Sequence, residues 1–488
     1  MNIKPASGGP RDALWARLLP AATVLVAALM LISLKFGFLD YFIPTTWHGR
    51  LGYDFFSVPR AFLNLEHGHS IYNSRLSQFG PYVTWFPFHP AAAVLLGSWL
   101  SLFAPWNSYA AFVVFSLLLL GAGAYSLARR APDALSARLA WFALFCSPAA
   151  YLMLWNGQAQ VLLVCALCLI CADLLNPDGG SRFRPLLFAG ILLSLLSKPA
   201  ILPALPALFA VKRMRRTLLL SLGIYALVSA LFVLVPALNP QAAGLKAVAD
   251  AALHPEHMFR VEYYRGLLVR SYRPELVLDN SIHWLNMKSR MAFTEAHHFE
   301  LFSLPALLDW LASRPLPRAV YQLPAALALL WSVPLYLVRE GRAKDRMALA
   351  VVSMSMLAFF LSYSQVYEYH YTVALAMLPP VFFFARSSGC DASYLRYAAW
   401  FCGAAALLFA PTPYYWFRNP AFGHHNPALG LMKDPFVSTV VAGCPYGYAL
   451  TPMRLFRVVP AFVMFAASAA WLLREYRGYL AKEHGKEI

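Results

Sequence analysis

Residues 186–216 read LLFAGILLSLLSKPAILPALPALFAVKRMRR, an apolar run that ends in a basic cluster. About 20 apolar residues let a helix cross the hydrocarbon core of a membrane, so this run is too long for one straight crossing. Lys198 and three prolines interrupt its middle. Broken helices at membrane depth normally line a cavity, because the freed backbone groups need partners there. We therefore expect a membrane protein whose chain breaks near Lys198, as one broken span or two short segments.

The composition of the whole chain indicates the same class. Of 488 residues, 60% are hydrophobic and only 13% are charged, which is typical of a polytopic membrane protein and not of a soluble core. The net charge is +17, but Lys and Arg fall in short clusters between apolar runs, such as ARR at 128–130 and REGRAKDR at 339–346. Such clusters are typical of cytoplasmic loops that follow the positive-inside bias, and they argue against a nucleic-acid partner.

The apolar runs predict an all-α polytopic membrane protein with about 11 to 13 transmembrane helices and short interfacial helices in its outside loops. We expect a single membrane domain over residues 1–488. The first transmembrane helix is expected at 18–37, further transmembrane helices at 89–236 and 319–411, and the last one at 456–473. The outside loops between them are 38–88, which holds an interfacial helix, the long loop 237–318, and 412–455. Residues 474–488 are expected to form a cytoplasmic tail. Residues 89–104 stay open between a crossing and a re-entrant segment.

One acid in the first outside loop raises a question of function. Residues 51–73 read LGYDFFSVPRAFLNLEHGHSIYN, in which the apolar residues recur at helical spacing from Pro59 to Glu66. That spacing predicts a helix along the membrane interface. Asp54 comes just before this helix. A carboxylate there can cap the helix N-terminus or act as a general base, and local spacing leaves both interpretations open.

A series of short elements, in a fixed order, resembles glycosyltransferase family 87 from about residue 50 to residue 386. The matching residues are Asp54, Phe55, Ala61, Leu65, Gly68 and Tyr72 in the first loop, Gly157 and Gln158 in WNGQAQ, Gly190, Lys198 and Pro199 in the opening run, Asn280 in LDNSIHWL, and His370 and Pro379 in SQVYEYHYTVALAMLPP. WFPFHP resembles a further element, with Phe88-His89-Pro90 in place of the usual Tyr-Pro-Pro. The tyrosine pair expected near Val58 and Pro59 is missing, and Gln160 stands where the family usually has Asn.

The resemblance implies a GT-C-type membrane enzyme that uses a polyprenyl-phosphate sugar as donor. It would transfer a mannose-like hexose or a pentose, with inversion, to a lipid-linked or glycan acceptor on the outer face of the cytoplasmic membrane. Asp54 would be the general base, with Glu368 as the second choice. One carboxylate suffices, because a phosphate leaving group needs little protonation. We expect membrane lipid as a further partner; the sequence leaves the oligomeric state open, with a monomer favoured.

The remaining candidates would bind the donor. Lys198 is the first choice for the phosphate, because an ionised lysine in an apolar run usually has a partner or a function. Snorkelling to the interface is its alternative. His370 is assigned to the phosphate or to Asp54. Donor binding is also predicted for Gln158, Asn156, Tyr72, Arg60, His89, Asn280 and Arg290. The histidine pairs at 297–298 and 424–425 have no carboxylate or cysteine complement at ligand spacing, so no metal and no cofactor is predicted.

A transporter or flippase of a lipid-linked sugar is the alternative function. That class has acids and broken helices within the membrane and weak internal symmetry between halves. The chain has broken apolar runs, but its acids cluster in the predicted outside loops and no internal repeat is evident. Release of free polyprenyl phosphate separates the two functions, because only a transferase produces it.

Overall fold

The computed structural model describes residues 10–41, 51–67, 71, 77–82, 86, 88–176, 183–234, 303–305, 307–308, 316–362, 366, 368–387, 392–411 and 451–483. Every regular element with bounds in these ranges is a helix. In chain order they are α1 (Pro10–Phe36), η1 (Phe38–Tyr41), α2 (Ser57–Glu66), α3 (Pro90–Ala92), the π-helical turn η2 (Ala93–Gly97), α4 (Ser98–Leu100), α5 (Pro105–Ala128), α6 (Ala134–Phe145), α7 (Pro148–Asn156), α8 (Gln160–Leu174), α9 (Pro185–Ser197), η3 (Pro199–Ala204), α10 (Leu205–Ala210), α11 (Lys212–Leu234), α17 (Arg318–Leu330), α18 (Pro334–Leu337), α19 (Arg342–Ser362), η5 (Glu368–Tyr371), α20 (Thr372–Ala376), α21 (Leu378–Arg386), α22 (Ala392–Leu407) and α25 (Thr451–Glu483).

The lengths of these helices confirm an all-α polytopic membrane protein. In the described part of the chain, six stretches are long and apolar enough to cross a membrane, and they lie in α1, α5, α11, α17 with α18, α19 and α25. The pair α6 and α7, bent by 45° at its break, makes a seventh if it counts as one span. Length and composition thus support fewer crossings than the predicted number of about 11 to 13. The difference arises because several predicted spans, among them α8 and α9, are shorter helices of 10–17 residues.

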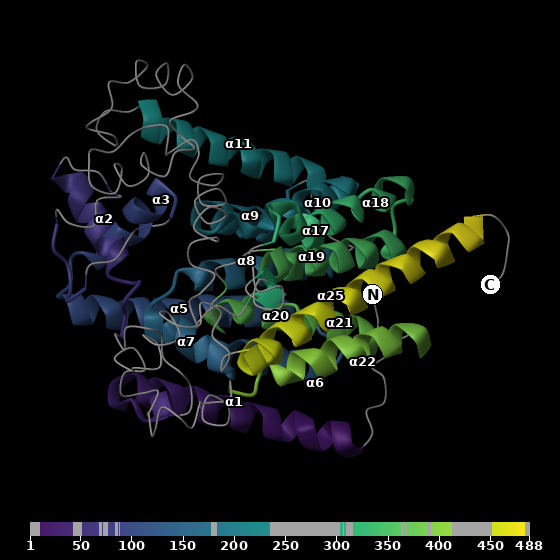
Figure 1. Ribbon diagram of the computed structural model, residues 1–488, viewed down its shortest axis with the longest axis horizontal. Helices are drawn as coiled ribbons and strands as arrows, with labels where there is room; N and C mark the ends of the chain where they lie inside the picture. Colours follow the sequence, from purple (N-terminus) through teal and green to yellow (C-terminus); the bar gives the residue numbers. More distant parts are fainter. Residues whose placement is uncertain are drawn as a thin grey trace.

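The bundle has enclosed helices and peripheral ones (Figure 1). Every residue of α8 is buried, and α8 packs between α5 and α9. Within the apolar stretch of α19, 83% of the residues are buried, against 11% for α1. α19 packs against α17 and α25, whereas α1 packs mainly on α6. The apolar residues of α1 that remain exposed are those expected to face lipid.

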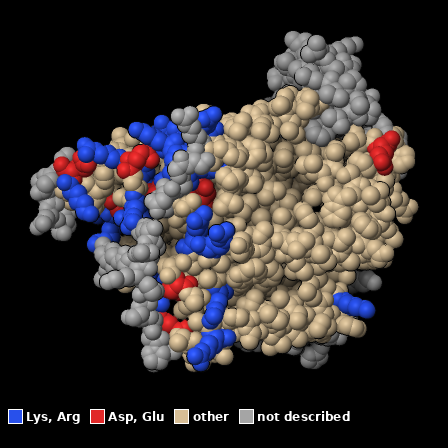
Figure 2. All heavy atoms as spheres, turned by 180° about the vertical axis from the view of Figure 1, so that it is seen from behind, with Lys and Arg blue, Asp and Glu red and all other residues tan. Residues whose placement is uncertain are grey.

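Charged side chains gather at one end of the bundle, which we call the charged end. Figure 2 shows Lys, Arg, Asp and Glu concentrated at the left of that view, beside a broad surface of other residues. The charged end is defined by the ion pairs of Arg386 with Asp12 and Asp133, Arg184 with Asp173, Arg213 with Asp345, and Arg346 with Glu475. α2 and α3 lie at the opposite end (Figure 1). Residues that belong to separate basic clusters of the sequence therefore share one end of the fold.

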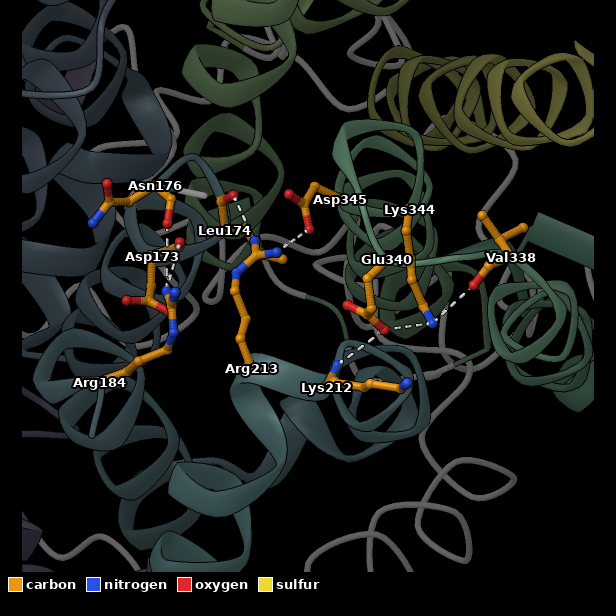
Figure 3. A network of polar contacts seen from close by, with 10 residues as sticks. All are labelled: Asp173, Leu174, Asn176, Arg184, Lys212, Arg213, Val338, Glu340, Lys344 and Asp345. Carbon is orange, nitrogen blue, oxygen red and sulfur yellow. Dashed lines mark hydrogen bonds and ion pairs between the residues drawn. The ribbon is translucent and has the colours of Figure 1, made fainter. Parts of the chain in front are cut away.

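The run that opened the sequence analysis forms a hairpin. Arg184, just before α9, pairs with Asp173 at an N–O distance of 2.8 Å. Arg213, just after α10, pairs with Asp345 at 2.5 Å and donates to the carbonyl of Leu174 at 3.4 Å. Figure 3 shows both arginines reaching toward the end of α8 at the charged end. Residues 185–210 thus leave the charged end along α9 and return along η3 and α10, with Lys198 at the break between the two arms.

Residues 90–100 do not cross the bundle. The ring of His89 lies 3.0 Å from the Ser229 hydroxyl, near the far end of α11. At the other end of the segment, the hydroxyl of Ser108, in the first turn of α5, donates to the carbonyl of Leu100 at 2.7 Å. Both contacts lie at the opposite end, and eleven helical residues extend about 16 Å, well short of a hydrocarbon core of about 30 Å. The short π-helical turn packs under α2, so this segment supports the first loop.

Candidate functional site

Asp54 lies in a turn that is fixed against the end of α7. The backbone N–H of Gly52 donates to the carbonyl of Trp155 at 2.7 Å, and that of Asp54 donates to the carbonyl of Asn156 at 3.1 Å. Carbonyls at a helix C-terminus have no partner within the helix, so these bonds satisfy groups that would otherwise be orphaned. Gly157 adopts φ +65°, and a Cβ there would collide with the side chain of Phe55. The close approach of the two turns therefore requires glycine at this position.

Asp54 is not the N-cap residue of α2. Helix α2 begins at Ser57 with Phe56 as its N-cap residue, and the side chain of Phe56 makes no capping bond. Its first amides are satisfied by the main chain, because the N–H groups of Phe56, Ser57 and Val58 donate to the carbonyls of Gly52, Asp54 and Phe55 respectively. The helix itself runs two residues further at its start than the predicted Pro59–Glu66. A tight backbone turn, which includes the carbonyl of Asp54, thus supports the start of α2.

The carboxylate of Asp54 instead meets the turn between α7 and α8. Nε2 of Gln158 donates a hydrogen bond to Oδ2 of Asp54. Gln158 is buried, whereas Asp54 is half-buried. An enclosed amide that donates to one carboxylate oxygen fixes the direction of the carboxyl group without supplying a charge that would neutralise it. Gln158 is therefore in a position to orient the predicted base. The sequence had instead predicted that Gln158 binds the sugar.

Lys198 and His370 form a second polar pair. Nζ of Lys198 lies 3.5 Å from Nε2 of His370, although 172 positions separate them. Nζ also lies 5.6 Å from the centroid of the Tyr369 ring. Both side chains are nearly enclosed, at 4% and 3% exposure. Two groups that can each carry a positive charge meet in a confined site, and an anion between them would stabilise both charges.

The two polar groups lie at similar depth in the bundle. Helix α8 has 15 residues and α9 has 13, so they extend about 22 Å and about 20 Å from the charged end. They pack along each other and are joined at the charged end by Asp173 and Arg184. Their other ends carry Gln160 and Lys198. In addition, α7, which holds the Asp54 turn, packs against η5, which holds His370. The structure therefore brings Asp54, Gln158, Lys198 and His370 to one region of the bundle.

Two other predicted donor ligands, Arg60 and His89, make hydrogen bonds within the fold. Nη2 of Arg60 donates to the carbonyl of Tyr82 at 2.5 Å, and burial lowers the pKa of this guanidinium from its ordinary value. Nδ1 of His89 accepts from the N–H of Ala91 at 3.1 Å and so caps α3. Its Nε2 faces Ser229, and burial lowers the pKa of His89 to about 4. A neutral histidine with both ring nitrogens engaged in the fold is a poor candidate for donor phosphate.

Several predicted residues lie outside the described part of the chain. These are Tyr72, Asn280 and Arg290, and also the side chain of Glu368, whose backbone lies in η5. The side chain of Asn156 is buried, and its carbonyl accepts from the Asp54 turn. Among the described residues, no group of three or more His, Cys, Asp or Glu is arranged to hold a metal ion.

Sequence reasoning missed Gln160 as a functional candidate. This residue is fully buried, and neither Nε2 nor Oε1 of its side chain has a hydrogen-bond partner in the structure as described. A buried amide without partners costs stability, so its presence needs an explanation. The signal in the sequence is a second glutamine two positions after Gln158, in WNGQAQ.

Comparison with models of known protein families gave no match, and comparison with curated protein sequences found no similar protein.

Proposed function

We propose that this protein is an integral membrane glycosyltransferase that takes a sugar from a polyprenyl-phosphate donor, with Asp54 as general base. The observation that carries the proposal is the orientation of the half-buried Asp54 carboxylate by Gln158, in the same region as the Lys198–His370 pair. A base and an anion site on either side of one sugar are the two requirements of such a transfer. The ordered motifs of the sequence support the same class.

The reaction assigns one task to each group. The acceptor hydroxyl attacks the anomeric carbon of the donor and gives its proton to Asp54. The new bond joins the acceptor oxygen to that carbon, and the bond from the carbon to the phosphate oxygen breaks. The electron pair leaves with the polyprenyl phosphate. Lys198, with His370 beside it, stabilises the negative charge that grows on the phosphate as this bond breaks. Attack opposite to the leaving group inverts the configuration.

The distribution of charge supports an orientation of the site. The ion pairs that define the charged end include five arginine contacts, on Arg184, Arg213, Arg346 and Arg386. By the positive-inside rule, this end lies in the cytoplasm. Asp54 then faces the exterior of the cytoplasmic membrane. A lipid-linked donor suits that location, because its tail stays in the bilayer while its phosphate and sugar reach the surface.

The test replaces Asp54 by Asn in the full-length protein, reconstituted with polyprenyl-phosphate sugars and membrane lipid extract as acceptor. Because the amide cannot accept the proton, we expect transfer to fall by about 10²- to 10⁴-fold. The capacity to bind polyprenyl phosphate should persist, since Asn keeps the shape of the side chain. Glu368→Gln is the matched control for the second choice of base.

Three results would change the assignment. Near wild-type transfer by Asp54→Asn, with loss in Glu368→Gln, would move the base to η5. Retention of activity in both variants would remove carboxylate catalysis from this region. Movement of intact donor across a vesicle membrane, without release of free polyprenyl phosphate, would replace the transferase by the flippase alternative.

A further inference from the structure

We propose that Gln160 binds the hydroxyl groups of the transferred sugar and helps to select which sugar the protein uses. This inference rests on the proposed transferase function and deepens it. The starting observation is that Gln160 is fully buried while both polar atoms of its amide are unpaired within the structure as described. A donor and an acceptor side by side match a pair of neighbouring sugar hydroxyls.

The position of Gln160 on α8 shows which neighbour it faces. On the same helix, Cys168 packs against Gly123 of α5, and Ile170 packs against Gly190 of α9. Sγ of Cys171 lies 4.0 Å from Sδ of Met377, the residue that follows α20. Eleven residues make almost three helical turns, so Gln160 lies within about 20° of the direction of Cys171 and about 80° from those of Cys168 and Ile170. Gln160 therefore lies on the face of α8 that meets α20.

That face leads to the Lys198–His370 pair. α20 follows η5 directly, and η5 carries His370. α7, which precedes α8 in the chain, packs against η5. Gln158 lies in the turn between α7 and α8 and donates to Asp54. Gln160 is the first residue of α8 and lies on the face that meets α20, the helix that follows η5.

This arrangement places Gln160 between the two reacting ends of the donor. During transfer the sugar must contact the acceptor hydroxyl beside Asp54 and the phosphate beside Lys198. A side chain on the element between these groups contacts the sugar ring. Because Gln160 is fully enclosed in the free protein, the sugar reaches it only after neighbouring side chains move. A site built to pair with hydroxyls rejects a sugar that presents them differently, since the amide then stays unpaired.

The experiment measures dissociation constants of the full-length protein for bare polyprenyl phosphate and for the same lipid phosphate carrying mannose, glucose, galactose or arabinose. In wild type, we expect one sugar to bind more tightly than the bare phosphate. Gln160→Met keeps the shape without the amide. It should bind bare phosphate as wild type does but lose about tenfold of the affinity for the preferred sugar, the typical effect of one lost hydrogen bond. Gln160→Asn should restore part of the loss.

Thermal stability supplies a second readout. Because Gln160→Met removes two unpaired buried groups, its melting temperature should equal or exceed that of wild type. Ser355→Ala is the matched control, since its hydroxyl on α19 is also buried without a partner in the described structure. This variant should keep stability and all affinities.

Each contrary outcome has a distinct meaning. An unchanged preference for sugar in Gln160→Met would overturn the inference while leaving the transferase proposal intact. A clear loss of stability would show an internal partner for the amide and would also overturn the inference. Absence of binding of every lipid phosphate by wild type would overturn the transferase proposal and this inference together.

Discussion

Two buried lysines at opposite ends of the bundle show how a structural cation differs from a candidate site. Lys344, at the charged end, donates to Oε1 of Glu340 at 2.8 Å and to the carbonyl of Val338 at 3.1 Å (Figure 3). Lys198, at the opposite end, meets an imidazole and an aromatic ring. Lys344 is paired with a carboxylate inside the fold, whereas Lys198 lies beside a second group that can carry a positive charge. We propose that Lys344 belongs to a structural clamp at the charged end and that Lys198, with His370, forms an anion site.

The largest effects are expected when the charge of each buried lysine is removed in turn. Lys198→Met should lower the transfer rate by about 10²- to 10³-fold, as is typical when one group that stabilises transition-state charge is lost. Its melting temperature should stay close to that of wild type. Lys344→Met should show the reverse pattern, with a lower melting temperature and an unchanged rate per folded molecule. Rate measurements and thermal melts on both purified variants test the contrast, and it fails if both lose stability and keep activity.

The next test concerns the ion pair of Asp173 and Arg184 at the charged end. Asp173 and Arg184 are both nearly enclosed, and they join α8 to the start of the hairpin. Asp173→Asn leaves the arginine charge without its carboxylate, so we expect a loss of about 3 kcal/mol in the free energy of unfolding. Changing both residues, Asp173→Asn with Arg184→Leu, should recover most of this loss. Denaturant titration in detergent measures the difference. Equal losses in the single and double variants would show that the pair is not a unit.

The smallest expected effect is the loss of stability at low pH when Asp133 is protonated. Burial alone would raise the pKa of Asp133, but hydrogen bonds from the N–H of Ser136 and from Arg386, together with the charge of Arg386, hold it below its ordinary 3.8. The folded state therefore favours the ionised form. This contribution to stability is present above pH 3.8 and is lost as the pH falls through the lower folded value.

Because the pair is partly exposed, the contribution is under about 1 kcal/mol. Thermal melts between pH 6 and pH 3 should show a small loss at the acid end that Asp133→Asn lacks. The same loss in both proteins would assign it to other groups.

Much of the fold could be predicted from local pattern. The spacing of apolar residues predicted the helix before Glu66, and it was found at Ser57–Glu66. Lys198 and its following proline predicted a broken run, and α9 ends one residue before Lys198. These features follow from helix propensity, proline geometry and the cost of charge in lipid, which act over a few residues. The number of crossings was less predictable, because a short apolar helix can be enclosed by protein without spanning.

The sequence predicted which residues belong to the candidate site better than it predicted the contacts between them. Asp54, Lys198 and His370 were chosen from the sequence, but the partner of each was not. The Gln158 contact with Asp54 joins positions 104 apart. Arg60 and His89, both predicted to bind the donor, make hydrogen bonds within the fold that the sequence did not predict, because a buried polar group takes whichever partner the fold brings near it.

The sequence by itself determined the class of the protein, the helical character of its segments and the positions of its basic clusters, because hydrophobic length and charge cost are properties of the local chain. Only the tertiary structure decided that the run around Lys198 turns back to the charged end, that backbone carbonyls support the start of α2, and that the enclosed Gln160 amide has no hydrogen-bond partner among the described residues. These features depend on which helices pack together. A hydrogen bond between distant segments forms only after that packing has brought its donor and acceptor atoms to about 3 Å from each other.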